Sequence, residues 1–387
     1  MIADLEGSWE PADSVVSIKD GFMAEKGDAI ETVTRRALLR LGAASIALPA
    51  MGLLAAGCRK SMTGQAPVVQ TVAKQRRLVW IPQAAGDWEL PIRVGQMEFC
   101  RMVNWDYQHI GNPIYSVENH LDQMDEAISA RPDVIVTELE SPGMVSGFRR
   151  AMERGITIVI VDQVVETEAA NLGLGYIKQD SEALGHLNGL QAAQWAERIS
   201  GKKQGVVLIG NGNPGSALID ALQTATEAGV VAYNQERATH FTTESFADSA
   251  FDDIGTSISK YSYHMEQKGA DLVAMVGLGG ASGIAIWKAL RENDITPGKQ
   301  IAAGSTDIFS DQQTGIEEGY LQWGIDQDFL VMGFLSAAAA WLQLEHAYPA
   351  WRMGSPGQVV TRANVGETRI KTNLWVERAR KLGLIAS

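Results

Sequence analysis

The sequence predicts a doubly wound α/β fold, because short apolar runs alternate with longer amphipathic stretches from Leu78 onward. The runs are rich in Val, Ile and Leu, which is typical of strands buried on both faces of a parallel sheet. The composition agrees with a globular chain, since 45% of the 387 residues are hydrophobic and 20% are charged. That length predicts two or three domains.

The expected elements follow from these patterns. Helices are predicted from Ser141-Pro142 to Gly155, from Asp180 or Ser181 through Trp195, from Ser216 to Gly229, and from Ala281 to Asn293. The predicted strands are Leu78–Ile81, Trp105–Ile110, Val134–Thr137, Ile156–Val161, Val206–Ile209, Val230–Tyr233, Leu272–Val276, Ile301–Ala303 and Leu321–Ile325.

The charge and the cysteine count exclude several classes of function. The chain carries 33 basic and 46 acidic residues, a net charge of −13, which argues against nucleic acid or an anionic membrane surface as the main partner. Two cysteines exclude a disulfide framework and a multi-thiolate metal site. The six histidines show no H-x-x-H or H-E-x-x-H spacing, so neither a metal nor any other cofactor is expected.

The N-terminal segment reads as an export leader. Thr34-Arg35-Arg36 precedes an uncharged stretch that runs from Leu41 to Cys58, a pattern similar to the twin-arginine signal. Eighteen residues are marginal for a membrane-spanning helix. Residues 1–58 are therefore predicted to form a cleavable leader region, and Met23 is an alternative start to Met1.

The end of the leader resembles a bacterial lipobox. Leu54-Ala55-Ala56-Gly57-Cys58 would place a lipid on Cys58, whereas ordinary cleavage nearby is the alternative. We expect an exported protein, periplasmic or extracytoplasmic, anchored through Cys58. The leader holds 5 basic and 8 acidic residues, so the remaining chain keeps a charge of −10 and the single thiol of Cys100.

Two glycine-rich loops follow predicted strands and open helices. Gly210–Gly215 matches G-x-G-x-x-G, a dinucleotide signature. However, Pro214 removes a backbone donor and no acidic residue ends the next predicted strand, so a tight turn or a polar ligand contact through Asn213 is the alternative. Gly277–Gly283 lacks a G-K-[ST] ending, and Ser282 is not in G-x-S-x-G, so neither nucleotide hydrolysis nor hydrolase chemistry is expected.

Polar side chains at strand ends form the candidate site. Asp87 and Trp88 follow the first predicted strand, while Asp162, Asp307 and Gln327 follow three others. Carboxylates and amides bind hydroxyl groups, and an indole face packs on the C–H face of a sugar ring. One such carboxylate is often only a helix cap. Several at the carboxyl ends of parallel strands favour a site for a neutral polyol.

From about Leu78 to Leu384 the chain resembles the type I periplasmic sugar-binding proteins of ABC transporters, the ribose/galactose-binding group. The resemblance rests on an ordered set of motifs: Pro132–Thr137, Gly155–Asp162, Gly304–Asp307, Gly319–Asp328 and Met332–Phe334. It implies two parallel-sheet lobes joined by a three-segment hinge. The implied ranges are a tether at 59–77, an N-terminal lobe at 78–178 plus 328–356, and a C-terminal lobe at 179–327 plus 357–387.

The same resemblance implies how the site residues act. Trp88 would stack on the sugar, and Asp162, Asp307 and Gln327 would bind its hydroxyls, with Asp87 as a weaker candidate. Three positions depart from the family pattern: Ala221 replaces a frequent arginine, Gly279 replaces a frequent asparagine, and Glu89 follows Trp88 where a second aromatic residue is expected. Residues proposed to compensate are Asn213, Glu140, Trp323 and the loop Phe241–Phe251.

The resulting hypothesis is a monomeric, non-enzymatic solute-binding protein. It would capture a small sugar or polyol between its lobes and deliver it to the permease of an ABC importer in the membrane, without a nucleic-acid partner. The alternatives are an exported NAD(P)-dependent oxidoreductase that uses Gly210–Gly215, and a ligand sensor with the same fold.

Overall fold

The computed structural model describes residues 75–114, 116–251, 253–355 and 357–385, with the side chain of Asp87 left out. The predicted leader, the lipidation site Cys58 and residues 59–74 of the predicted tether lie outside these residues. The first strand, β1, begins at Arg77, so the last residue of the predicted tether belongs to the folded part.

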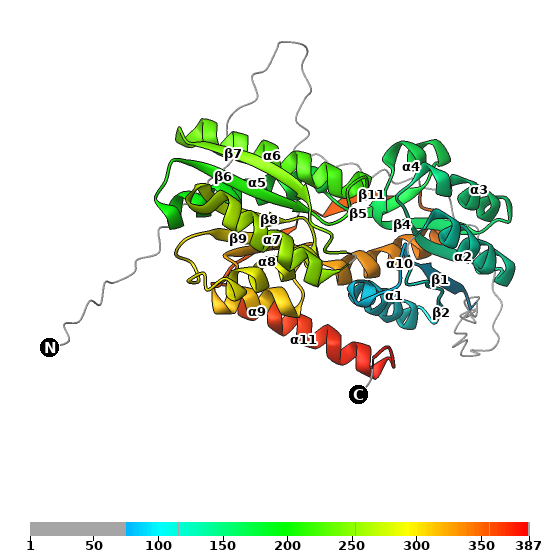
Figure 1. Cartoon of the computed structure of the whole chain (residues 1–387). Coiled ribbons are helices and arrows are strands. Elements are labelled where there is room, and N and C mark those ends of the chain that lie inside the picture. Colours follow the sequence, from blue (N-terminus) through cyan, green and yellow to red (C-terminus); the bar gives the residue numbers. More distant parts are fainter. Residues whose placement is uncertain (1–74, 115, 252, 356, 386–387) are drawn as a thin grey trace, which may run out of the picture. The chain divides into compact units, whose positions relative to one another are not determined.

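Two six-stranded sheets organise the described chain (Figure 1). The N-lobe sheet has the order β11-β5-β4-β3-β1-β2, and all its pairings are parallel. Its strands are β1 Arg77–Ile81, β2 Asp106–His109, β3 Val134–Leu139, β4 Thr157–Val164, β5 Gly175–Gln179 and β11 Arg352–Ser355.

The C-lobe sheet repeats this order as β12-β10-β9-β8-β6-β7, except that β12 runs antiparallel to β10. Its strands are β6 Gln204–Asn211, β7 His240–Ala247, β8 Leu272–Gly277, β9 Ala302–Thr306, β10 Trp323–Asp326 and β12 Gln358–Val360. The chain passes between the lobes three times: after β5, after β10 and between β11 and β12.

Helices cover both faces of each sheet. In the N-lobe, α1 and α10 pack on the face that carries Leu78, Trp80 and Val136, while α2, α3 and α4 cover the face of Val79 and Ile135. The helices are α1 Leu90–Met102, α2 Val117–Ala130, α3 Val145–Glu153, α4 Glu166–Leu172, α5 Ser181–Ser200, α6 Ala217–Arg237, α7 Ile254–Lys268, α8 Gly280–Glu292, α9 Ser310–Glu318, α10 Phe329–His346 and α11 Val365–Lys381. Short 3₁₀ turns cover Asp87–Glu89 (η1), Pro142–Met144 (η2) and Gly269–Asp271 (η3).

Two of the predicted helix starts, at Ser141 and at Asp180, are confirmed by side-chain caps. The Ser141 hydroxyl accepts from Gly143 N, with Pro142 at the first position of η2. The Asp180 carboxylate accepts from Ala183 N at the start of α5, at 3.0 Å. Each side chain satisfies a backbone N–H that has no partner within the helix, which is why these residue types mark helix starts.

The predicted strand Val230–Tyr233 is wrong, because α6 continues through it to Arg237. Gly229 was read as the end of the helix, but it lies where α6 crosses α5. A Cβ there would stand 2.2 Å from His186 O and 3.0 Å from Gly189 Cα. The glycine therefore permits close helix packing rather than ending the helix, and the apolar residues after it are helical core.

Four strands were missed. β7 is an edge strand, largely exposed and polar in sequence, and it includes most of the predicted Phe241–Phe251 loop. β5, β11 and β12 are short, and β11 and β12 take part in the third passage between the lobes. A search for continuous apolar runs detects central parallel strands and passes over edges.

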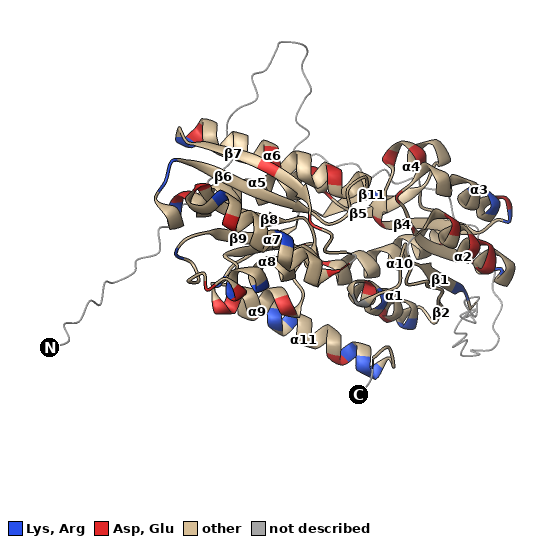
Figure 2. Ribbon diagram, viewed as in Figure 1, with Lys and Arg blue, Asp and Glu red and all other residues tan. Residues whose placement is uncertain are grey.

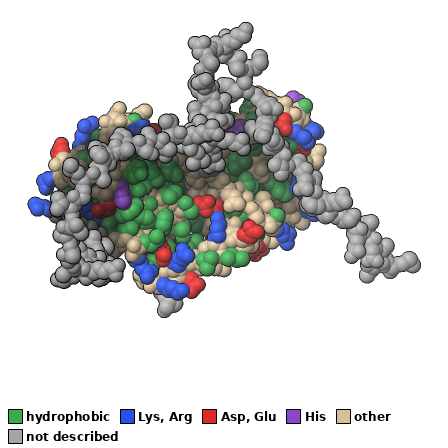
Figure 3. Space-filling model, turned by 180° about the vertical axis from the view of Figure 1, so that it is seen from behind, with side chains coloured by type: hydrophobic (Ala, Val, Ile, Leu, Met, Phe, Trp, Pro, Cys, Tyr) green, Lys and Arg blue, Asp and Glu red, His purple; other side chains and the backbone are tan. Residues whose placement is uncertain are grey.

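One described helix, α10, is long and apolar enough to cross a membrane by length and composition alone. Its residues Met332, Ala337 and Ala340 belong to the N-lobe core with strands β1, β3 and β4. Figure 3 shows hydrophobic side chains gathered on the face of the molecule opposite to the view of Figure 1. Val331 of α10 is one of the large apolar residues that are exposed, with 45% of its surface accessible.

Candidate functional site

A bulge in the N-lobe sheet creates the acidic part of the site. The register of β3 with β4 shifts between Thr137, which pairs with Ile160, and Leu139, which pairs with Val164. One residue of β3 therefore faces three residues of β4, and the middle one is Asp162. Its φ is 67°, in the left-handed region that aspartate tolerates better than most residues.

Glu138 and Asp162 form a buried acidic pair at this bulge. Glu138 Oε2 accepts from Gln83 N at 2.5 Å. Glu138 Oε1 and Asp162 Oδ1 are buried and receive no hydrogen bond from any other described residue. Burial, and next the charge of Asp162, raise the pKa of Glu138 well above its usual value, which favours its protonated form.

The pKa of Asp162 is raised to about 7, first by burial and next by the charge of Asp307, against the hydrogen bond from Glu138, which lowers it. Asp162 belongs to the N-lobe sheet and Asp307 follows β9 of the C-lobe sheet. The carboxyl ends of the two sheets therefore face each other closely enough for these two charges to interact.

Two glutamines extend the acidic pair. With its amide nitrogen toward Glu140, Gln83 donates to both oxygens of that carboxylate and accepts from Gln163 Nε2. Gln163 Oε1 is buried and unpartnered among the described residues. The carboxyl ends of β3 and β4 thus carry a connected set of polar side chains. Among the described residues, Gln163 Oε1 in this set has no hydrogen-bond donor.

The C-lobe contributes Asp307, which also has a left-handed φ, of 68°. Its Oδ2 accepts from Gly280 N at 2.7 Å, at the start of α8, and its Oδ1 accepts from Gln327 Nε2. Burial raises the pKa of Asp307 to about 6, although these two hydrogen bonds lower it. Gln327 Oε1 and the hydroxyls of Ser305 and Thr306 are buried and unpartnered in the described part of the chain.

Trp88 stands beside the site on η1. Its Nε1 donates to Ala84 O at 3.1 Å, which fixes the indole. Its ring contacts Phe329 edge-on with centroids 6.3 Å apart, and Phe329 in turn stacks on Phe309 at 6.0 Å. These rings form a continuous aromatic series from the end of β1 to the loop after β9.

Glu89 anchors the turn that carries Trp88. It is 1% exposed, accepts from Trp80 Nε1 at 2.5 Å, and lies 3.1 Å from His109 Nε2. The sequence interpretation treated Glu89 as the replacement of a second aromatic residue. The structure gives it another role, since it ties η1 to β1 and β2.

Phe251 explains the departure at Gly279. A Cβ on Gly279 would stand 2.9 Å from Phe251 Cζ, and its φ of 136° is a conformation that side chains rarely adopt. A Cβ on Gly212 would stand 2.3 Å from the same ring. The two glycines therefore make room for Phe251, which is 53% exposed at the strand-end loops of the C-lobe.

The loop Gly210–Gly215 is a structural turn, which removes support from the dinucleotide alternative. Asn213 N donates to Asn211 Oδ1 at 3.0 Å, and Gly215 N donates to Asp220 Oδ2 at 3.1 Å, so these amides already have partners. Asp220 also places a negative charge in the first turn of α6, where a phosphate would need to lie. Asn213 is half-buried in this loop, and its backbone N–H is bonded to Asn211 rather than to the acidic cluster.

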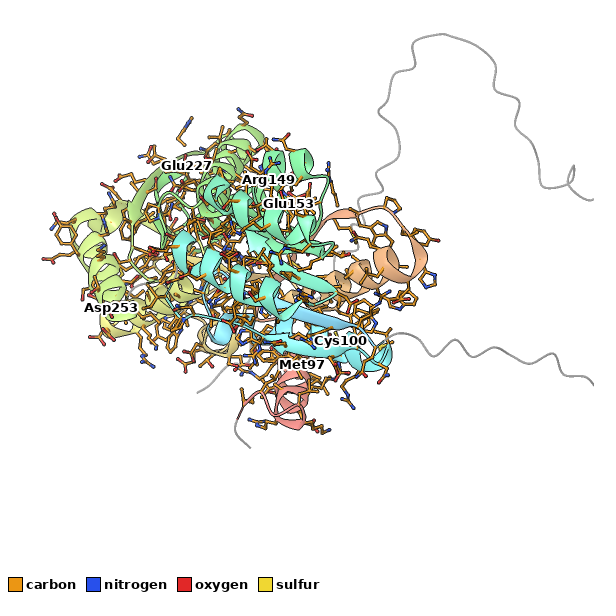
Figure 4. All side chains as sticks on the ribbon, turned by 90° about the vertical axis from the view of Figure 1, so that its right-hand side faces the viewer. Met97, Cys100, Arg149, Glu153, Glu227 and Asp253 are labelled. Carbon is orange, nitrogen blue, oxygen red and sulfur yellow. The ribbon has the colours of Figure 1, made fainter. Side chains whose placement is uncertain are left out.

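Three other residues that the sequence analysis singled out do not contribute to the site. Trp323 is fully buried in the C-lobe core and donates to Asn188 Oδ1 at 2.7 Å, so its proposed compensating role is wrong. Ala221 is exposed on α6. Cys100 lies on α1 near Met97, as Figure 4 shows, and burial raises the pKa of its thiol to about 12, which makes it unreactive.

Sequence reasoning missed Glu138, Gln83 and Gln163. One signal was present: Glu138 and Glu140 end a buried apolar run, in the same relation to β3 that Asp162 has to β4. The side chain of Asp87 lies outside the described residues. Among those that are described, no group of three or more His, Cys, Asp or Glu side chains is arranged to hold a metal ion.

The fold and site together define a class of protein: two parallel α/β lobes whose strand ends face each other and carry buried, unpartnered polar groups. The sequence profile of the periplasmic binding protein domain matches residues 78–347. The chain belongs to that family.

Relatives and solved structures agree with this assignment. The xylose/arabinose-binding protein XylF of Sulfolobus acidocaldarius is 26% identical in an alignment of 272 residues. The alignment covers 66% of this chain and 62% of that protein. The chain thus matches less than two thirds of that relative's length.

Solved structures share the fold at low identity. A solute-binding protein of an ABC transporter from Burkholderia graminis, in complex with D-arabinose, has a TM-score of 0.66 and 20% identity, over 76% of this chain and 97% of that one. GanP, a glucose-galactose binding protein from Geobacillus stearothermophilus, has a TM-score of 0.63 and 17% identity, over 75% and 99%.

Proposed function

We propose that the protein is an extracytoplasmic solute-binding protein that captures a small polyhydroxylated ligand between its lobes. The observation that carries the proposal is the set of buried, unpartnered polar atoms at the facing strand ends. Buried polar atoms without partners are rare in folded proteins and cost about 1–3 kcal/mol each. A ligand rich in hydroxyl groups, enclosed by lobe closure, would satisfy them.

The residues divide the work by chemistry. Asp162, Asp307 and Gln327 would hydrogen-bond ligand hydroxyls, and Trp88 would pack against the ring. Phe251 offers a second aromatic surface from the C-lobe. Asn213 and Asp87 remain candidates. The similarity to XylF, a xylose/arabinose-binding protein, and to GanP, a glucose-galactose binding protein, supports this substrate class.

The wider role is part of the same proposal. The protein would deliver its ligand to an ABC importer, act as a monomer, and be held at the membrane by lipid on Cys58 after twin-arginine export. The lobes would comprise 78–178 plus 328–356 and 179–327 plus 357–387. A sensor role remains the second candidate, because the same closed state could be read by a receptor.

A thermal-shift screen of the chain from residue 60 tests the binding function. The panel would include xylose, arabinose, glucose, galactose and myo-inositol, followed by calorimetry of each hit. A ligand at 100 times its dissociation constant should stabilise the fold by about 2.7 kcal/mol. Asp125→Asn is the matched control, since Asp125 is exposed and its carboxylate pairs with Arg150 on the surface, at 2.8 Å. If no polyhydroxylated compound binds, the proposal fails.

A further inference from the structure

The unpartnered side-chain atoms of the site include three oxygens that can only accept, beside the hydroxyls of Ser305 and Thr306, which can donate or accept. Gln163 Oε1 and Gln327 Oε1 are buried without a donor among the described residues, and their residues are 7% and 3% exposed. Asp162 Oδ1 is likewise buried without a hydrogen-bond donor among the described residues. Amide and carboxylate oxygens only accept, so a ligand that fits them must bring donors.

The site also has an excess of negative charge. The charges that act on Glu138, Asp162 and Asp307 come from one another, from Glu140 and from Asp326. No lysine, arginine or histidine of the described chain is among them. Figure 2 shows Lys and Arg on helices such as α3 and α11, among other elements.

A neighbouring acidic pair shows how this protein usually balances such charge. Asp326 and Asp328 share Lys371, whose Nζ lies 2.9 Å from Asp326 and 3.1 Å from Asp328. Ala221, which is exposed on α6, has no charged group that could supply a similar cation to the strand ends. Buried carboxylates without a counter-charge are costly, since each has lost its hydration.

We propose that the ligand itself supplies the missing cation, as a protonated amino group on a polyhydroxylated ring, lying between Asp162 of the N-lobe and Asp307 of the C-lobe. This inference rests on the proposed solute-binding function and narrows its substrate class to amino- and iminosugars. An ammonium group fits better than a metal ion, because the carboxylates do not converge as a metal site in the described residues. It also brings two or three donors to a surface of acceptors.

Matched ligand pairs test the proposal by calorimetry at pH 7. Glucosamine is compared with glucose, galactosamine with galactose, and 1-deoxynojirimycin with 1-deoxyglucose, with N-acetylglucosamine as the form without charge. We expect the amine of at least one pair to bind tenfold or more tightly than its neutral partner. If the neutral sugar binds as tightly in every pair that binds, the cation inference is overturned while solute binding stands. If neither form of any pair binds and the wider screen is also negative, both fail.

Two further measurements separate charge from shape. Asp307→Asn should weaken binding of the amine by a factor at least three times larger than the factor by which it weakens binding of the neutral sugar. Asp125→Asn should leave the ratio of the two affinities unchanged. Proton release, read from the dependence of the calorimetric heat on buffer ionisation enthalpy, should accompany amine binding near pH 6.5. The physical reason is that a cation favours the ionised form of carboxyl groups whose pKa is raised. Equal proton release with the neutral sugar would contradict the inference.

Discussion

The two lobes share one plan but treat the same residue differently. In each lobe an aspartate of left-handed conformation lies at the carboxyl end of the fourth strand: Asp162, near the end of β4, has φ 67°, and Asp307, directly after β9, has φ 68°. Asp307 is satisfied in advance by Gly280 N and Gln327. Asp162 instead meets Glu138, another acid. The C-lobe aspartate is therefore already stabilised within its lobe, whereas the N-lobe aspartate carries most of the unmet interaction energy.

The difference originates in the strand beside each aspartate. In the N-lobe, Glu138 is the second-last residue of β3, at the bulge against β4, and the charge of Glu140, which follows the strand, acts on it. In the C-lobe, β8 ends in Gly277, and the glycines that follow let a helix begin close to Asp307. A helix N-terminus favours a carboxylate and a second acid opposes it, so the same backbone position has two electrostatic environments.

The largest effect is expected where the lobes are alike. In both, the helix that enters from the other lobe crosses the first helix through glycine: a Cβ on Gly229 would lie 2.2 Å from His186 O, and a Cβ on Gly333 would lie 2.1 Å from Ile92 O. Gly229→Ala and Gly333→Ala should each lower the free energy of unfolding by about 3 kcal/mol, since backbone cannot move aside cheaply. Denaturant unfolding measures this.

Gly366→Ala is the matched control for these variants, because a Cβ there meets nothing within 4 Å on α11. It should be neutral or stabilise by up to about 1 kcal/mol through helix propensity. If only one of the two crossings is sensitive, the equivalence of the lobes does not extend to their helix packing.

Asp162→Asn should have the largest effect on binding. It should weaken ligand affinity about 100-fold, because it removes a charged, buried acceptor. It should also raise the melting temperature of the ligand-free protein at pH 7.5, since the cost of a buried charge disappears. A variant that binds normally, or that unfolds at a lower temperature, would show that Asp162 is structural.

Asp307→Asn should cost less, about tenfold in affinity, since the partners Gly280 and Gln327 already share its charge. Titration of both variants with the same ligand by calorimetry makes the comparison direct. A loss at Asp307 equal to or larger than that at Asp162 would contradict the asymmetry between the lobes.

The smallest effect is a pH dependence of stability. The folded-state pKa values of Asp162 and Asp307, about 7 and about 6, lie above the usual aspartate value of 3.8. Their stabilising contribution is complete below that usual value and is lost as pH rises through 6 and 7. The ligand-free protein should therefore melt roughly 2–4 °C lower at pH 8 than at pH 6.5 for each kcal/mol lost.

His120 sets the lower limit of that pH window. Burial lowers its pKa to about 4, so its contribution to stability falls as pH drops below its usual value of 6.5, in the opposite direction. Scans between pH 6.5 and 8 avoid this group, and Asp162→Asn should flatten the slope. A melting temperature that rises over this range would contradict the assignment of the raised pKa to Asp162.

Much of the fold followed from local patterns. The central strands and the starts of α5 and η2 were readable because buried parallel strands are continuously apolar and helix starts need side-chain acceptors. The end of α6 was not readable. Gly229 has the same sequence appearance as a terminating glycine, and only the approach of α5 shows that it is needed inside a helix.

The proposed site combines residues that the sequence nominated with residues that it missed. Asp162, Asp307 and Gln327 were nominated from their positions at strand ends, and in the structure Gln327 Nε2 donates to Asp307 and the charge of Asp307 acts on Asp162. Trp323 was misassigned. Side chains alternate between the two faces of a strand, and the sequence alone does not show that Trp323 faces the core of the C-lobe. Glu138 was missed because its importance comes from the bulge opposite it.

The sequence by itself determined the class of fold, the family and the residue types proposed to bind the ligand, since each depends on local order along the chain. The tertiary structure alone decided which of those residues are satisfied. Hydrogen-bond partners and charge neighbours come from segments far apart in sequence, such as Gly280 for Asp307 and Glu138 for Asp162. The balance of donors, acceptors and charge that selects a ligand is a property of that assembly, because burial removes the water that would otherwise satisfy every group.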